Sequence, residues 1–172
     1  MDRPQLLKEL QSYQTSFPEE KEYIRSFLEL LTSNDAFHRT YLPGHITGSA
    51  WIINADKTKV LLVHHAKLNK WLQPGGHADG DDNVLRVAEE ETGLKQLTVI
   101  GEQIYDLDIH LIPTRKDFPQ HFHYDIRFLV QADEKERIVV SEESHDVKWI
   151  PLLSLETYNS EPSIIRMKQK LL

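Results

Sequence analysis

Apolar residues recur at helical spacing in the N-terminal part of the chain. A first helix is predicted over residues 3–14. A second helix should begin near Ser16, because Ser16 and Glu19 have the spacing of a capping box and Pro18 stands just inside the first turn. Together they predict a helical N-terminal extension, residues 1–40, that buries one face. Its apolar positions are Leu6, Leu7, Leu10, Tyr13, Tyr23, Ile24, Phe27, Leu28, Leu30 and Leu31.

From His45 onward the pattern changes to short runs rich in β-branched residues. The segments ITGSAWIIN and VLLVHH, joined by the turn-like NADK, predict a β-hairpin. The Gly- and Asp-rich run PGGHADGDD predicts a loop. A short helix from Asn83 to Thr92 should follow, with Gly93 as its C-terminal cap.

The remainder of the chain continues this alternation of strands and helices. Further strands are predicted over residues 97–112, 121–132 and 147–150, and a helix is predicted at the C-terminus. Mixed strands with helices outside them indicate an α/β or α+β sandwich, which we assign to one domain over residues 41–172.

Composition narrows the class of protein. The 172 residues are 40% hydrophobic, which suits a domain of ordinary size, and the absence of cysteine excludes disulfides, zinc-thiolate sites and thiol nucleophiles. The N-terminus lacks a signal-like apolar run, and no run approaches the ~20 residues that span a bilayer. We therefore expect a soluble, cytoplasmic protein that does not bind membranes.

The net charge of −7 argues against a nucleic acid polymer as partner, since such partners normally require a basic surface. An acidic protein can still process a small anionic substrate if a bound cation offsets the repulsion. The charge balance thus points toward a metal.

The segment WLQPGGHADGDDNVLRVAEEETGL joins a glycine-rich turn to a helix that bears three adjacent glutamates, Glu89, Glu90 and Glu91. Attack of water on a phosphoanhydride needs a cation to neutralise the phosphate oxygens, and Mg²⁺ or Mn²⁺ prefers carboxylate and backbone oxygens. Clustered glutamates on one short helix provide such ligands.

Successive helical residues are turned by about 100°, so the three glutamates cannot share one face. Glu91 follows Val84, Val87 and Ala88 on the apolar side, where a carboxylate is costly unless it is paired or metal-bound, so it is the first candidate ligand. Glu90 lies four residues after Arg86, which predicts an ion pair. The third, Glu89, is expected in solvent.

This segment resembles the signature of the Nudix hydrolase family, G-x5-E-x7-R-E-U-x-E-E-x-G-U, where U is aliphatic. Its PGG turn and its EExGU end match, and a weaker resemblance runs from His45 to Leu155. The resemblance implies a Nudix-type α/β/α sandwich with a mixed β-sheet. It also implies hydrolysis, dependent on Mg²⁺ or Mn²⁺, of a nucleoside diphosphate linked to another moiety or of a related organic pyrophosphate.

The resemblance assigns roles to residues of the motif. Glu90 and Glu91 would hold the metal, the backbone of Gly76 would approach it, and Arg86 would orient the carboxylates. In some relatives an acidic residue of a late loop is the water-activating base, which suggests Glu143; a loop side chain in solvent is the alternative reading of Glu143 and of Glu142 beside it.

The motif also departs from the signature by four residues. With its C-terminal part aligned, Val87 replaces the glutamate that normally follows the arginine; with its N-terminal part aligned, Asp82 replaces the first glutamate and a stretch resembling x-R-E-U is missing after Ala88. Three explanations of this departure stay open. The motif is divergent, with Asp79, Asp81 or Asp82 as a ligand; the enzyme is weakened; or the sequence lacks residues that the protein contains.

Polar residues alternate with apolar ones in two later strands. His121, His123, Asp125 and Arg127 would share one strand face, as would Asp106, Asp108 and His110 in the other strand. These faces predict a cleft wall in which His121, His123 and Arg127, with His77 from the glycine-rich turn, bind the substrate. The alternatives are a half-solvated sheet and, for the His-x-His pair, a transition-metal site.

Other functions compete with hydrolysis. A non-catalytic or weakly active Nudix-like nucleotide-binding module is the main alternative, because one glutamate is lost. The isomerase branch of the fold needs a catalytic cysteine, which the chain lacks. Trp51, Trp71 and Trp149 are expected in the core rather than stacked on a base. The N-terminal helices offer an apolar surface for a possible homodimer.

Overall fold

A computed structural model describes residues 2–77, 84–101, 103–114 and 118–171. It groups the chain into two units: unit 1 consists of Met1–Gly48, Gly76–Asn83 and Gln103–Arg127, and unit 2 of Ser49–Gly75, Val84–Glu102 and Phe128–Leu172. Two long strands, β1 (Gly44–Ile53) and β7 (His121–Gln131), contribute residues to both units.

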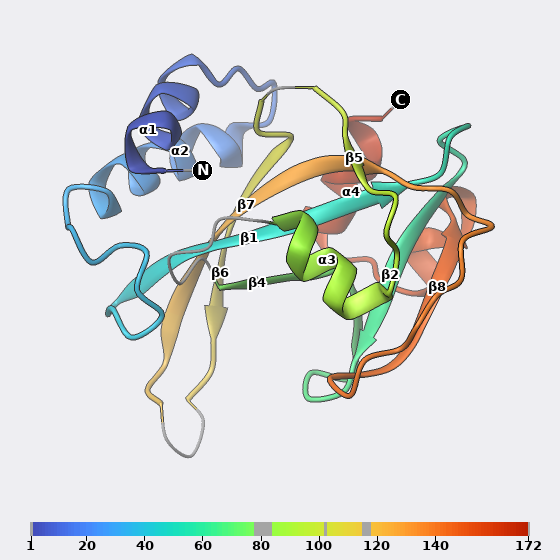
Figure 1. Cartoon of the computed structure of the whole chain (residues 1–172). Coiled ribbons are helices and arrows are strands. Elements are labelled where there is room, and N and C mark those ends of the chain that lie inside the picture. Colours follow the sequence, from blue (N-terminus) through green and yellow to red (C-terminus); the bar gives the residue numbers. More distant parts are fainter. Residues whose placement is uncertain (1, 78–83, 102, 115–117, 172) are drawn as a thin grey trace. The chain divides into compact units, whose positions relative to one another are not determined.

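Unit 1 contains the N-terminal helices α1 (Arg3–Ser12) and α2 (Pro18–Leu30) and the strand β6 (Asp106–Ile112), coloured in Figure 1 along the sequence. Both predicted helices are therefore present. The β6 strand pairs antiparallel with β7, so that Asp106 faces Arg127 and His110 faces His123 across the ladder.

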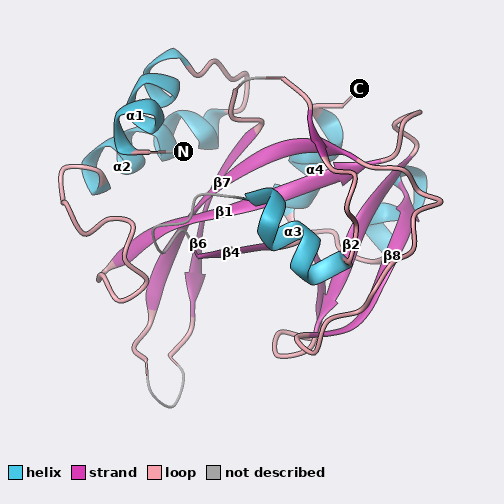
Figure 2. Cartoon of the chain, viewed as in Figure 1, coloured by secondary structure: helices cyan, strands magenta, loops and turns pink. Residues whose placement is uncertain are grey.

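Unit 2 contains the predicted hairpin. Its second strand, β2 (Lys59–His65), is antiparallel to β1, with Ile52 opposite Leu61. The same strand pairs with β8 (Ser144–Pro151) along its whole length and with the short β3 (Lys70–Leu72) near its end. The helices α3 (Val84–Thr92) and α4 (Pro162–Gln169) and the 3-10 helix η1 (Leu152–Thr157) belong to this unit, and Figure 2 separates helices from strands by colour.

The sheet is mixed. The β1 and β7 strands are hydrogen-bonded neighbours. The Phe122 N–H donates to the Pro43 carbonyl at 2.8 Å, and the Ala132 N–H donates to the Ile53 carbonyl at 3.0 Å. Donor and acceptor are separated by the same number of residues in both bonds, so these strands run parallel. By contrast, β2 is antiparallel to β1, β3 and β8, and β6 is antiparallel to β7.

Three local predictions were wrong. The predicted strand over residues 97–112 is interrupted: β5 covers only Thr98–Val99, and the chain resumes as β6 after Gly101, whose φ of 83° lies in the left-handed region. Part of the predicted PGGHADGDD loop is a strand, β4 (Gly75–His77), which pairs with β1. Ser16 does not cap α2: the N-cap is Phe17 without a side-chain bond, and Thr15 accepts from the Phe17 N–H.

The N-terminal helices bury the apolar side chains on which a homodimer was predicted. Leu6, Leu10 and Phe27 are all at most 1% exposed. The fully buried Glu20 of α2 accepts hydrogen bonds from the Tyr13 hydroxyl at 2.7 Å and from the Leu107 N–H of β6 at 3.0 Å. These contacts fasten α2 to β6 within unit 1. The homodimer and the boundary at residue 40 stay predictions.

The core of unit 2 is formed by strand residues and the apolar face of α3. Ala50, Leu61, Val63 and Val130 are buried together with Ala88, and Val84 packs against them. Trp51 is fully buried, as predicted, but Trp71 and Trp149 are only partly buried. None of the helices in the described residues is long and apolar enough to cross a membrane.

Gly93 ends α3 as predicted, with a φ of 76° and its N–H bonded to the Glu89 carbonyl at 2.7 Å. A Cβ at this position would stand 2.6 Å from the Val139 Cβ and 2.9 Å from the Val139 backbone nitrogen. At Gly101, which also has a positive φ, an added Cβ would meet nothing within 4 Å.

We therefore expect Gly93→Ala to lower the free energy of unfolding more than Gly101→Ala. The positive φ costs roughly 1 kcal/mol at either site, and the contact with Val139 adds to that cost only at Gly93. Urea denaturation of both variants measures the difference. Equal losses of stability would show that Val139 does not constrain the end of α3.

Candidate functional site

Glu91 is held between the end of α3 and the glycine-rich turn. Its neighbours on the helix, Val84 and Ala88, pack into the core of unit 2, which confirms that Glu91 lies on the apolar side. The Gly75 N–H donates to the Glu91 carboxylate at 3.2 Å. Two parts of the motif separated along the chain are thus joined by one hydrogen bond.

The electrostatics around Glu91 are unfavourable to a bare carboxylate. Burial is the main cause that raises the pKa of Glu91 to about 7; the negative charges of Glu143 and Glu90 contribute to the rise, and the hydrogen bond from the Gly75 N–H opposes it. The negative charges of two other carboxylates therefore act on Glu91. A bound divalent cation would offset both the cost of burying the charged carboxylate and the repulsion from those charges. We call Glu90, Glu91 and Glu143 the carboxylate site.

The other charged residues of α3 lie toward solvent. Arg86 and Glu90 form the predicted ion pair at 2.6 Å, with side chains 44% and 60% exposed. Glu89, expected in solvent, is ion-paired with Lys95. Arg86 therefore contacts Glu90 of the carboxylate site.

Some predicted ligands are not tested by this geometry. Asp79, Asp81 and Asp82 lie outside the described residues, so a replacement for the missing glutamate among them stays a prediction. Gly76 is the middle residue of β4, directly after the Gly75 that binds Glu91. Val87, at the place of the family's glutamate, is a partly buried apolar residue of α3.

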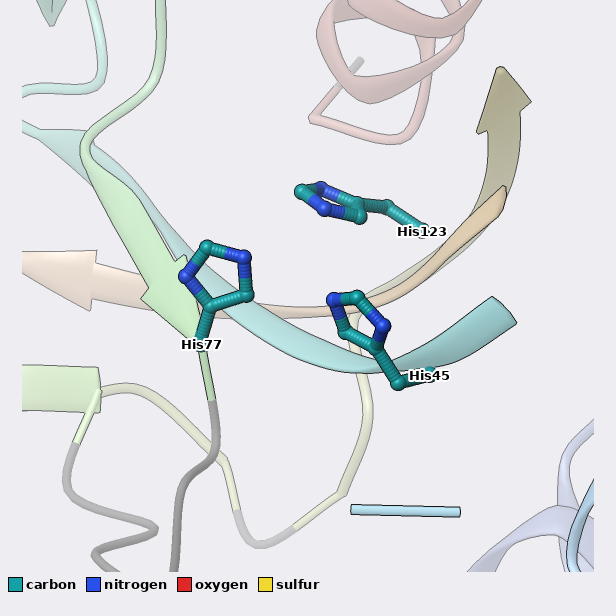
Figure 3. Close-up of side chains that lie close together, drawn as sticks. All are labelled: His45, His77 and His123. Atoms are coloured by element: carbon teal, nitrogen blue, oxygen red, sulfur yellow. The ribbon is translucent and has the colours of Figure 1, made fainter. Parts of the chain in front are cut away.

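A second polar group lies in unit 1, where five histidines gather. His45 of β1, His77 of β4 and His123 of β7, which we call the histidine triad, each offer a ligand atom, and these atoms lie within 4.8 Å of one another. Figure 3 shows the three rings converging from different strands. His110 and His121 adjoin His123, with ring centroids 5.4 and 5.1 Å from it.

The structure thus brings His77, His121 and His123 together, and it adds His45, which the sequence analysis missed. The sequence held a signal for it, because His45, Thr47 and Ser49 alternate with other residues along the predicted strand. The structure shows that all three are buried. Burial, with the neighbouring histidines, lowers the pKa of His123 to about 2, so this ring is uncharged at neutral pH.

Arg127 lies in a buried group of carboxylates. Its guanidinium donates to Asp125 at 2.8 Å, to Asp108 at 3.0 Å and to Asp106 at 3.1 Å, and the Arg127 side chain is 3% exposed. The neighbouring carboxylates raise the pKa of Arg127. Because all three guanidinium nitrogens bond to aspartates, the geometry speaks against the predicted contact with substrate.

Comparison with known proteins shows the family to which the chain is related. The NUDIX domain profile matches residues 43–170. No curated protein matches the chain by sequence. A NUDIX-family hydrolase from Clostridium perfringens is similar in structure, with 27% identity and a TM-score of 0.54 over 74% of this chain and 95% of that one.

Two further solved structures share the fold at lower identity. A C. elegans Ap4A hydrolase binary complex has 15% identity and a TM-score of 0.58, over 73% of this chain and 93% of that one. The NUDIX domain of Shewanella oneidensis NrtR, complexed with ADP ribose, has 18% identity and a TM-score of 0.53, over 84% and 95%.

The chain belongs to the Nudix family, and its fold is the predicted Nudix-type α/β/α sandwich with a mixed sheet. Its class is accordingly that of hydrolases that act on pyrophosphate bonds, as the motif predicts.

Proposed function

We propose that the chain hydrolyses a nucleoside diphosphate linked to another moiety, with Mg²⁺ or Mn²⁺ held at the carboxylate site. The observation that carries this proposal is the largely buried Glu91 carboxylate, which accepts the Gly75 N–H and whose pKa is raised by burial and by the negative charges of Glu143 and Glu90. Ap4A and ADP ribose, named with two structurally similar proteins, are members of this substrate class.

The residues would divide the work as follows. Glu91 and Glu90 would hold the ion, helped by the backbone of Gly76, and Arg86 would fix Glu90 through its ion pair. The bound cation would neutralise the phosphate oxygens and acidify water. Glu143 accepts a proton from the attacking water, whose oxygen bonds to phosphorus as the bridging P–O bond breaks, giving two phosphate-bearing products.

We assign separate roles to the residues that were predicted to bind substrate. Arg127 positions the polar faces of β6 and β7 through its aspartates rather than contacting substrate. The proximity of His77 and His123 leads to a separate proposal below, while the substrate contact of His121 and the aspartate ligand Asp82 stay predictions.

The function is tested with a panel of ADP ribose, nucleotide sugars, dinucleoside polyphosphates and nucleoside triphosphates. Reactions contain Mn²⁺ or Mg²⁺, and a phosphatase converts newly exposed phosphomonoesters to inorganic phosphate; triphosphates are followed by chromatography. We expect turnover of a linked nucleoside diphosphate that EDTA abolishes. Binding of Mn²⁺ without turnover of any member would instead favour the nucleotide-binding module.

Metal affinity should depend on pH. Because the pKa of Glu91 is about 7 in the metal-free protein, this carboxylate is mostly protonated at pH 6 and must lose its proton to bind the ion. We expect the Mn²⁺ affinity to rise up to about tenfold per pH unit below 7 and to level off above pH 8. Calorimetry in two buffers of different ionisation enthalpy measures the released proton. Affinity independent of pH between 6 and 8 would contradict this assignment.

A further inference from the structure

We propose that the histidine triad binds a first-row transition ion, with Zn²⁺ as the preferred occupant, independently of the carboxylate site. His45, His77 and His123 come from three different strands, and their ligand atoms already lie within 4.8 Å of one another. The three imidazoles in Figure 3 face a common space.

The spacing of the triad is close to that of a metal site. Zn–N bonds are about 2.0 to 2.1 Å, so two nitrogens bound to one tetrahedral ion are roughly 3.3 Å apart. Small side-chain rotations would bring nitrogens within 4.8 Å to this separation. Next to the triad, His121 Nε2 and His123 Nε2 lie 3.2 Å apart, at hydrogen-bonding distance.

Two of the histidines, His45 and His121, have a ring nitrogen near a backbone carbonyl oxygen, as histidines around bound metals commonly do. A ligating histidine usually donates its other ring N–H to a carbonyl or carboxylate. His45 Nδ1 lies 3.4 Å from the Tyr41 carbonyl oxygen, which can only accept, so this contact favours the tautomer with the proton on Nδ1 and the lone pair on Nε2. His121 Nδ1 makes the same kind of contact, at 2.9 Å, with the Pro119 carbonyl oxygen.

A carboxylate contacts one of the histidines next to the triad. His110 stands opposite His123 in the β6–β7 ladder, and its Nδ1 lies 3.2 Å from Asp108. Asp108 in turn binds Arg127, so the buried ion-pair group holds the histidine that borders the triad. The triad itself lies in protected surroundings: His45 is fully buried, and His77 and His123 are partly buried.

The donor set selects the ion. Three imidazole nitrogens suit Zn²⁺, Co²⁺ or Ni²⁺, whereas Mg²⁺ requires oxygen ligands. Three protein ligands leave the fourth tetrahedral position for water or a substrate oxygen. The triad and the carboxylate site should therefore discriminate between the two kinds of metal.

The test is a Co²⁺ titration of the full chain after treatment with EDTA, followed by visible absorption. We expect one equivalent of Co²⁺ to give the intense bands of a tetrahedral site and one equivalent of Zn²⁺ to remove them. His77→Gln and His123→Gln should each weaken Zn²⁺ binding by about a hundredfold or more, since even residues that support ligands contribute 10- to 100-fold.

Two controls make the result specific. His38→Gln changes a histidine whose side chain is 67% exposed, and Glu91→Gln changes the carboxylate site; both should keep the cobalt spectrum and its stoichiometry. Circular dichroism and thermal unfolding establish that the variants are folded. Unchanged Zn²⁺ binding in folded His77→Gln would overturn the triad, as would loss of the spectrum in Glu91→Gln, and neither readout depends on hydrolysis.

Discussion

Glu91→Gln should reduce metal-dependent hydrolysis by about three orders of magnitude, because several kcal/mol of charge stabilisation are lost with the ion and each 1.36 kcal/mol is a factor of ten. The substitution removes the charge but keeps an oxygen that can accept the Gly75 N–H. Initial rates over a range of Mn²⁺ concentrations measure the effect. Glu89→Gln, on the same helix but paired with Lys95, should keep most of the activity.

The same variant should be more stable than the parent once metal is removed. The pKa of Glu91 is raised from 4.5 to about 7, so its ionisation costs nothing below pH 4.5 and its full amount above pH 7. We expect Glu91→Gln in EDTA to gain roughly 2 kcal/mol at pH 8, since one pKa unit is about 1.4 kcal/mol and partial exposure reduces the whole.

The gain should shrink toward pH 5, where the folded protein already carries a neutral Glu91. Chemical denaturation at both pH values, with and without Mn²⁺, separates the two effects of the substitution. A variant that is inactive and also less stable at pH 8 in EDTA would indicate a structural defect rather than loss of a metal ligand.

Arg127→Met should destabilise unit 1 by about 3 to 5 kcal/mol, the usual cost of removing one partner from a buried ion pair. Three buried carboxylates, those of Asp106, Asp108 and Asp125, would lose their shared cation. Methionine keeps much of the apolar volume, so the loss reports charge and hydrogen bonds. Urea denaturation at neutral pH measures it.

Arg25→Met is the matched control, because Arg25 and its partner Glu22 are 76% and 65% exposed. Exposed pairs contribute about 0 to 1 kcal/mol, so this variant should unfold almost as the parent does. A loss below 1 kcal/mol at neutral pH would show that the aspartates find other partners.

The sequence predicted the local elements well where periodicity was strong. The hairpin, the two N-terminal helices and the capping role of Gly93 depend on spacing and on one special backbone conformation, which neighbouring residues determine. Ser16 is not the cap because α2 begins at Pro18, which makes Phe17 the N-cap residue, and no side chain caps the first turn.

The candidate site also has features that the sequence predicted and features that it did not predict. Helix geometry identified Glu91 on the apolar side of α3 and the Arg86–Glu90 pair, since both depend on residues within two turns. The bond from Gly75 to Glu91 and the effect of Glu143 join segments far apart in the chain, which spacing does not reveal. Arg127 was predicted to bind substrate in a cleft wall because alternation shows which residues share a strand face but not how deeply that face is buried.

The most direct test of the carboxylate site is a crystal structure of the chain with Mn²⁺, using anomalous scattering to locate the ion. We predict a manganese peak bonded to a Glu91 carboxylate oxygen at about 2.0 to 2.3 Å, the range of oxygen ligands to small divalent ions, and absent from crystals of Glu91→Gln. A peak elsewhere, with Glu91 unligated in protein that retains its activity, would contradict the account.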